Sequence, residues 1–237
     1  MVRENFEKSD SFWMDKFDSI NVLRSMNKFH NNEINMIFSN FWNGIQDCLS
    51  SPKTLLLKNI LFFVHEVFQA GVNKNLDEKI IENLFPIVLR NSFNPSTKHK
   101  FIKVMCRDII KIIVQNYICN TTIMCLCEQV MLGFKNSKQS VANKDLAENS
   151  LHLLIEVLSQ LDTNISKCSE WTISCLASTL DHVLVNAPKK CQKLAKQAAR
   201  FLASQMGKNN YFLFVEMLAS KNMVTSPGGS ALLNKPF

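Results

Sequence analysis

Glycine and proline are scarce in this chain, with 6 of each among 237 residues. Apart from the two ends, no Gly-, Pro- or Ser-rich run would serve as an internal linker, so we expect one continuous folded array.

Long apolar runs are also lacking. The stretch ILFFVHEVF is interrupted by His65 and Glu66, far short of the roughly 18 residues that span a bilayer, which predicts a soluble protein. The N-terminal MVRENFEKSD has no apolar core, so we expect no signal or transit peptide and place the chain in the cytosol.

Motifs of catalysis and nucleotide binding are missing as well. The sequence contains no Gly-x-x-x-x-Gly-Lys, Gly-x-Gly-x-x-Gly or His-Glu-x-x-His. The histidines are scattered without a partnered Cys or Ser motif, at His30, His65, His99, His152 and His182. We therefore expect no enzymatic activity, no small-molecule substrate and no cofactor.

The chain has 8 cysteines but no secretion signal, which favours reduced, buried thiols over disulfides. Paired Cys-x-x-Cys or Cys/His sets, which a zinc site needs, are absent. The nearest approach is Cys125-Leu126-Cys127, whose two thiols point to different faces of a helix. We expect no metal site.

What the chain does have is apolar residues at helical spacing, such as Leu56, Ile60, Phe63 and Val67. Short polar stretches interrupt this pattern, namely HNNE, LSSP, GVNKN, SFNPSTKH, FKNSKQS, LDTN and NAPK. The segments that open near Trp13, Lys53, Lys98, Val141 and Lys189 are separated by 40, 45, 43 and 48 residues. This spacing is typical of HEAT or armadillo helix pairs. We predict an all-α, HEAT-like antiparallel helical-repeat solenoid of about five to six helix pairs. The alternative is a compact irregular helical bundle.

The formal net charge is +7, and lysine occurs in every loop that precedes these segments. The residues we single out are Trp13, Lys16, Ser51, Pro52, Lys53, Lys98, Lys100, Lys138, Lys189 and Lys190. A row of exposed cations that ends in an aromatic anchor suits a large acidic protein surface. The alternative is that the lysines are merely solvated helix ends and that Trp13 caps the array.

Nucleic acid is a competing partner for a chain with a pI near 9.0. Only 5 of the 27 basic residues are arginine, however, and base readout and phosphate binding favour arginine. We therefore rank nucleic acid below an acidic protein as the partner.

The segment QKLAKQAARFLASQM has the pattern of a basic amphipathic helix that binds a membrane surface or calmodulin. Its apolar face, with Leu194, Ala198, Phe201 and Leu202, is equally what a stacked repeat buries, and we favour a core helix.

The segment WMDKFDSINVL resembles the opening of TOG domains, the tubulin-binding HEAT-repeat modules, with Trp13, Lys16 and Ile20 at the family's three marked places. SSPKTLLLKNILFFVHEVF, STKHKFIKVMCRDIIKIIV and NAPKKCQKLAKQAARFLASQM are similar to later conserved helices of the family. The third of these four segments is most like the CLASP and crescerin variety.

The resemblance implies that the lysine loops face tubulin and that Trp13 projects to contact it. It implies a non-catalytic partner of tubulin or microtubules in the cytoplasm and cytoskeleton, with the cilium, centrosome and spindle as further locations. We assign residues 1–11 to an N-terminal segment, 12–221 to the TOG-like domain and 222–237 to a flexible tail. The runner-up is a HEAT-repeat scaffold for a different acidic protein.

Overall fold

The computed structural model describes residues 2–30, 38–70, 78–93, 99–116, 120–134, 141–161 and 168–206. These residues are helical apart from short connections, and no strand occurs among them. The predicted all-α fold is confirmed. The helices end at the polar stretches of the sequence: α5 stops at Gln69 before GVNKN, and α10 stops at Asn186, where NAPK begins.

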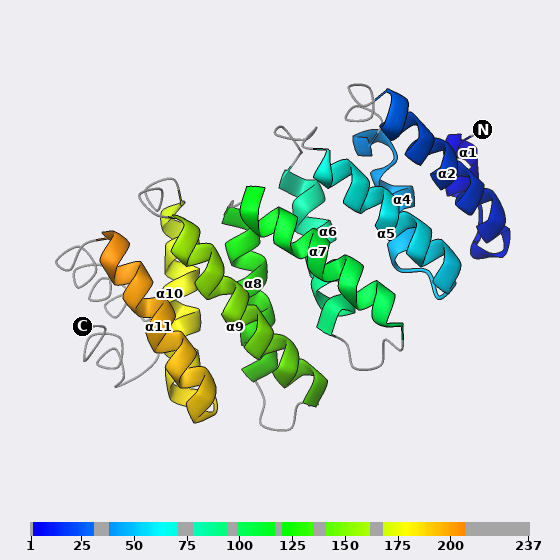
Figure 1. Ribbon diagram of the computed structural model, residues 1–237. Coiled ribbons are helices and arrows are strands. Elements are labelled where there is room, and N and C mark those ends of the chain that lie inside the picture. Colours follow the sequence, from blue (N-terminus) through cyan, green and yellow to red (C-terminus); the bar gives the residue numbers. More distant parts are fainter. Residues whose placement is uncertain are drawn as a thin grey trace. The chain divides into compact units, whose positions relative to one another are not determined.

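The chain forms two compact units, residues 1–117 and 118–237. In unit 1, one layer contains α1 (Val2–Glu7), α4 (Trp42–Leu49) and α6 (Glu78–Phe93). The other layer contains α2 (Trp13–Phe29), α5 (Thr54–Gln69) and α7 (Lys100–Asn116), with the 3-10 turn η1 (Asp10–Phe12) before α2. Each helix of the first layer packs on the next helix in sequence, which is the helix-pair architecture of HEAT repeats (Figure 1).

Unit 2 repeats this arrangement with α8 (Asn120–Phe134), α9 (Val141–Leu161), α10 (Glu170–Asn186) and α11 (Lys189–Met206). α8 pairs with α9 and α10 pairs with α11, while α8 also packs on α10 and α9 on α11. Gly133 lets α8 and α9 approach closely, because a Cβ at Gly133 would lie 2.2 Å from the Cβ of Ala147. Ser169 begins α10 as its N-cap and accepts a hydrogen bond from the Thr172 backbone N–H at 3.1 Å.

Aromatic side chains fill the core of unit 1. Phe38, Phe63 and Phe68 are almost completely buried, and the Phe38 ring centroid lies 5.8 Å from that of Phe63 and 6.4 Å from that of Phe68. Burying each such ring stabilises the fold by about 1.5 to 3 kcal/mol. The short helix α1 belongs to this packing, since Phe6 is buried and its ring lies 5.8 Å from that of Phe41.

The predicted tail, residues 222–237, lies outside the described residues.

The cysteines agree with the prediction of buried thiols. Among the described residues, Cys48, Cys106, Cys125, Cys127 and Cys191 are buried, whereas Cys168 and Cys175 are half-buried. Burial raises the pKa of the Cys106 thiol to about 12 and that of the Cys127 thiol to about 12.

Candidate partner-binding surface

The helices α2, α5 and α7 begin at the same end of unit 1 (Figure 1). The first residues of these helices, with the described residues just before them, therefore lie along one edge of the unit. A hydrogen bond of 3.4 Å between Thr54 Oγ1 and His99 Nε2 links the start of α5 to the residue before α7. We call this surface the loop edge and define it by Phe12, Trp13, Met14, Ser51, Pro52, Lys53, Leu55, His99 and Lys100.

Basic residues stand at helix N-termini, where the helix macrodipole disfavours them. Lys53 is the N-cap of α5, with extended backbone and no side-chain capping bond, and Lys100 is the first residue of α7. In unit 2, Lys189 is the first residue of α11. All three are exposed. A cation in the first turn costs about 0.3 to 1 kcal/mol. Because this placement does not serve helix stability, it favours a role for these lysines in binding a partner.

Trp13 is the first residue of α2 and is half-buried. Its ring meets that of Phe17 edge-on, with the centroids 6.5 Å apart and the planes at 82°. This contact is between residues four apart on one helix, which places the indole beside the helix and not in the centre of the unit. Trp13 therefore packs partly on its own helix and keeps part of its side chain accessible to solvent.

The prediction that Lys16 is exposed at this edge is wrong, because its side chain is buried, with only 3% exposed. Lys16 follows Trp13 by three residues and precedes Ile20 by four, which puts it on the line of α2 that faces the core. Ile20 is fully buried. Helical spacing, which carried the family resemblance here, also dictates the burial.

The residues of the loop before α5 differ in their exposure to solvent. Ser51 is buried, and its Oγ accepts a hydrogen bond of 3.2 Å from the backbone N–H of Lys53. Pro52 and Lys53 are exposed. Ser51 thus shapes the loop and presents its two neighbours to solvent.

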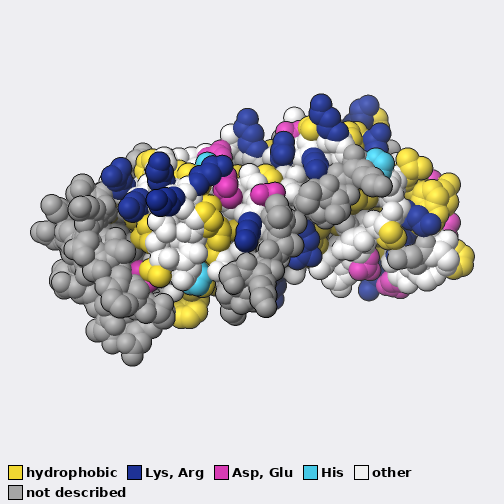
Figure 2. Space-filling model, turned by 90° about the horizontal axis from the view of Figure 1, so that it is seen from below, with side chains coloured by type: hydrophobic (Ala, Val, Ile, Leu, Met, Phe, Trp, Pro, Cys, Tyr) yellow, Lys and Arg dark blue, Asp and Glu magenta, His cyan; other side chains and the backbone are white. Residues whose placement is uncertain are grey.

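Sequence reasoning missed three exposed apolar side chains at the loop edge. Phe12 is 53% exposed, Met14 is 52% exposed and Leu55 is 60% exposed. They flank the starts of α2 and α5, which are neighbours in unit 1. A signal existed for Leu55, because the run TLLL puts three leucines in succession and a helix cannot turn all of them to one face. Figure 2 looks onto this end and shows hydrophobic and basic side chains at the surface of unit 1.

The remaining predicted lysines divide into two groups. Lys98 and Lys138 lie outside the described residues. Lys190 is exposed but forms an ion pair with Glu148 of α9. The hydrogen bond and charge of Glu148 raise the pKa of Lys190, with a smaller contribution from Asp145. Lys190 is therefore partly neutralised, whereas Lys189 forms no ion pair with any residue that the structure describes.

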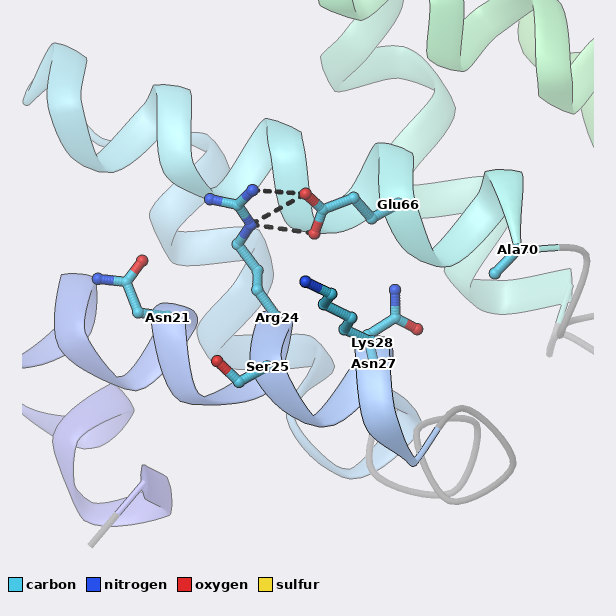
Figure 3. Close-up of a pocket in the computed structure, with 7 residues that line it drawn as sticks. All are labelled: Asn21, Arg24, Ser25, Asn27, Lys28, Glu66 and Ala70. Carbon is cyan, nitrogen blue, oxygen red and sulfur yellow. Dashed lines mark hydrogen bonds and ion pairs between the residues drawn. The ribbon is translucent and has the colours of Figure 1, made fainter.

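A polar network joins α2 to α5, and Figure 3 shows the part of it formed by Arg24 and Glu66. The Arg24 guanidinium donates to both carboxylate oxygens of Glu66 at 2.5 to 3.2 Å, and its Nη1 donates to Asn59 Oδ1 at 3.0 Å. Asn59 Nδ2 donates to the Phe17 carbonyl at 3.1 Å and to Asn21 Oδ1 at 2.9 Å. The hydrogen bonds that Arg24 donates to Glu66 raise the pKa of Arg24, against the opposing effect of partial burial.

This network borders an open cavity of about 560 Å³, lined by Asn21, Arg24, Ser25, Asn27, Lys28, Glu66 and Ala70. Since Glu66 already engages Arg24 through both oxygens, the main charge of the cavity is satisfied internally. The network fixes α2 against α5 and so positions Met14 relative to Leu55.

In the part of the chain that the structure describes, histidine, cysteine and acidic side chains nowhere form a group of three that could hold a metal ion. None of the helices in this part of the chain has the length and apolar character needed to cross a membrane.

No protein-family model and no curated protein matches the chain. Among solved structures, the chain is similar to one of crescerin, described as using a TOG domain array to regulate microtubules in the primary cilium. That match has a TM-score of 0.56 at 15% identity and covers 98% of this chain and 92% of the other. A designed armadillo repeat protein in complex with the peptide (KR)4 matches with a TM-score of 0.46 at 14% identity, over 100% of this chain and 98% of the other. Taken with the helix pairs of each unit, the crescerin likeness shows that the chain has a TOG-like HEAT-repeat fold.

Proposed function

We propose that the chain is a non-catalytic tubulin-binding module that regulates microtubule dynamics or organisation, and that the loop edge of unit 1 contacts tubulin. The observation that carries this proposal is the exposure of Phe12, Met14 and Leu55 beside Lys53 at the starts of two neighbouring helices. The crescerin likeness supports tubulin as the partner, because that protein is described as regulating microtubules.

The physical basis is an apolar anchor surrounded by cations. Apolar side chains that project from helix ends lose their contact with water on binding. This burial contributes about 25 cal/mol of favourable free energy per Å² of apolar area. Lysines raise the encounter rate with an acidic surface and make the affinity sensitive to salt. Helices that are packed in pairs hold these groups in place before the partner arrives, so little ordering cost is added.

The proposed contact residues combine the set predicted from the sequence with these observations. They are Trp13, Pro52, Lys53, Lys100 and Lys189 from the predicted set, Lys98, Lys138 and Lys190 as further cations, Ser51 as the residue that shapes its loop, and Phe12, Met14 and Leu55 as additions. Lys16 is removed from the set because it is buried. The proposed location is the cytoplasm and cytoskeleton, with the cilium as a specific case.

The test is binding of the purified chain to unpolymerised tubulin by size-exclusion chromatography, and to microtubules by co-sedimentation, at low and physiological salt. We expect Met14→Ser with Leu55→Ser to weaken binding by at least about tenfold, because both side chains leave water in the complex. Trp13→Ala should weaken binding as well. Trp171→Ala is the matched control, since Trp171 is 60% exposed at the start of α10 in the other unit.

Two results would contradict the proposal. One is the absence of binding to either form of tubulin by a chain whose helical circular dichroism is intact. The other is an equal loss of binding in the Trp171→Ala control. Electrophoretic shift assays with duplex and single-stranded DNA, run in parallel, assign the basic surface to nucleic acid if only those ligands bind.

A further inference from the structure

The helix α11 carries a one-sided line of positive charge that the loop edge does not include. Its sequence, KKCQKLAKQAARFLASQM, contains five basic residues and no acidic residue in 18. Lys189, Lys193, Lys196 and Arg200 are all exposed. They follow one another at intervals of four, three and four residues, which places them on one face of the helix. At a rise of 1.5 Å per residue, the line is about 16 Å long. We call it the α11 stripe.

The charges of the α11 stripe are not balanced by the described residues around them. Lys193, Lys196 and Arg200 have no ion-pair partner within the described ranges, in contrast to Lys190 with Glu148. Neighbouring members lie three or four residues apart, so they repel one another along the helix. Figure 2 shows Lys and Arg side chains gathered over α11. Because an anion bound to this exposed face would reduce the repulsion between the cations, the stripe is suited to binding an anionic ligand.

The surroundings of the stripe restrict the shape of that anion. On the α9 side, Glu148 and Asp145 lie close enough to Lys190 to raise its pKa. These carboxylates would repel the second phosphate backbone of a duplex or the plane of an anionic membrane. The exposed residues of α11 are Lys189, Lys190, Lys193, Lys196, Gln197, Arg200 and Ser204, so this helix presents no exposed apolar or aromatic side chain for membrane insertion or base stacking.

We propose that the α11 stripe binds an extended acidic peptide segment of a partner protein. In an extended chain, alternate side chains point to the same side at about 6.8 Å intervals, so a segment of about six residues with glutamate or aspartate at alternate positions spans the stripe. The cations along α11 are about 4.5 to 6 Å apart in the axial direction, which allows each carboxylate to reach one or two of them. This inference does not depend on the proposed function of the loop edge.

The experiment uses the full chain and a fluorescein-labelled peptide that alternates glutamate and serine, followed by fluorescence anisotropy. We expect the variant Lys193→Gln/Lys196→Gln/Arg200→Gln to weaken binding by roughly tenfold at low salt. Lys189 is left unchanged in it because Lys189 belongs to the proposed tubulin contacts. The matched control, Lys28→Gln/Arg90→Gln/Lys144→Gln, also removes two lysines and one arginine from exposed helix positions and should bind within about twofold of the wild type.

A charge-retaining variant, Lys193→Arg/Lys196→Arg, separates charge from folding and should bind like the wild type. Equal weakening in the matched control would overturn the proposal, because net charge alone would then explain binding. Preference for single-stranded DNA over the peptide, lost in the stripe variant, would overturn it in favour of nucleic acid. Because the stripe variant keeps the loop edge intact, its tubulin binding reports separately on the proposed function.

Discussion

Replacing Asn59 by alanine removes the centre of the polar network that holds α2 against α5. Asn59 is 4% exposed and makes three hydrogen bonds, to Arg24, to the Phe17 carbonyl and to Asn21. A neutral hydrogen bond contributes about 0.5 to 1.5 kcal/mol, and one to a charged group contributes about 1.5 to 3 kcal/mol. Asn21 is exposed, so water replaces its lost partner, and Arg24 keeps Glu66. The expected loss is therefore about 2 to 4 kcal/mol.

The assay is thermal unfolding followed by circular dichroism at the helix band. For a chain of this size, 1 kcal/mol shifts the midpoint by about 2 to 4 °C, so the Asn59→Ala midpoint should fall by about 5 to 15 °C. Asn83→Ala is the matched control, because Asn83 is exposed and donates to the Lys79 carbonyl of its own helix at 2.7 Å. If Asn59→Ala unfolds within about 2 °C of the Asn83→Ala variant, the reasoning about this network is refuted.

Three further predictions concern unit 2 and the buried thiols. Gly133→Ala should destabilise the chain by about 1 to 3 kcal/mol, although alanine favours helix, because its Cβ would overlap α9; a higher unfolding midpoint would show that the helices separate at no cost. Ser169→Ala should lower stability by about 1 kcal/mol by removing the cap on the Thr172 N–H, and an unchanged midpoint would contradict this. Iodoacetamide at pH 8 should label Cys106 far more slowly than the half-buried Cys168, since a pKa of about 12 leaves roughly one thiolate in ten thousand at Cys106; equal rates by mass spectrometry would contradict the burial.

The fold was predictable because helix periodicity and polar breaks are local signals. Apolar spacing in α5 and the stretches GVNKN and NAPK marked helix bodies and ends that the structure confirms. Their spacing gave the helix-pair repeat, which the packing within each unit also confirms. The division into two units was not predicted, because no Gly-, Pro- or Ser-rich linker marks the boundary between residues 117 and 118 in the sequence.

The candidate surface was less predictable because exposure depends on which face each helix buries. Lys16 was expected at the surface from its charge, but its place between Trp13 and Ile20 on the core-facing line of α2 buries it. Leu55 is hydrophobic but 60% exposed, because its neighbour Leu56 takes the buried place. Charge and hydrophobicity predict average burial, whereas helix phase decides individual cases.

Hydrogen–deuterium exchange of the chain with and without saturating tubulin tests directly whether the loop edge is the tubulin-binding surface. Amides at the starts of helices have no helical acceptor and exchange rapidly unless a partner covers them. We expect slower exchange in tubulin at residues 9–14 and 51–57, with no change around Trp171. Slower exchange confined to unit 2, or unchanged exchange throughout the chain, would contradict the assignment of the loop edge as the tubulin-binding surface.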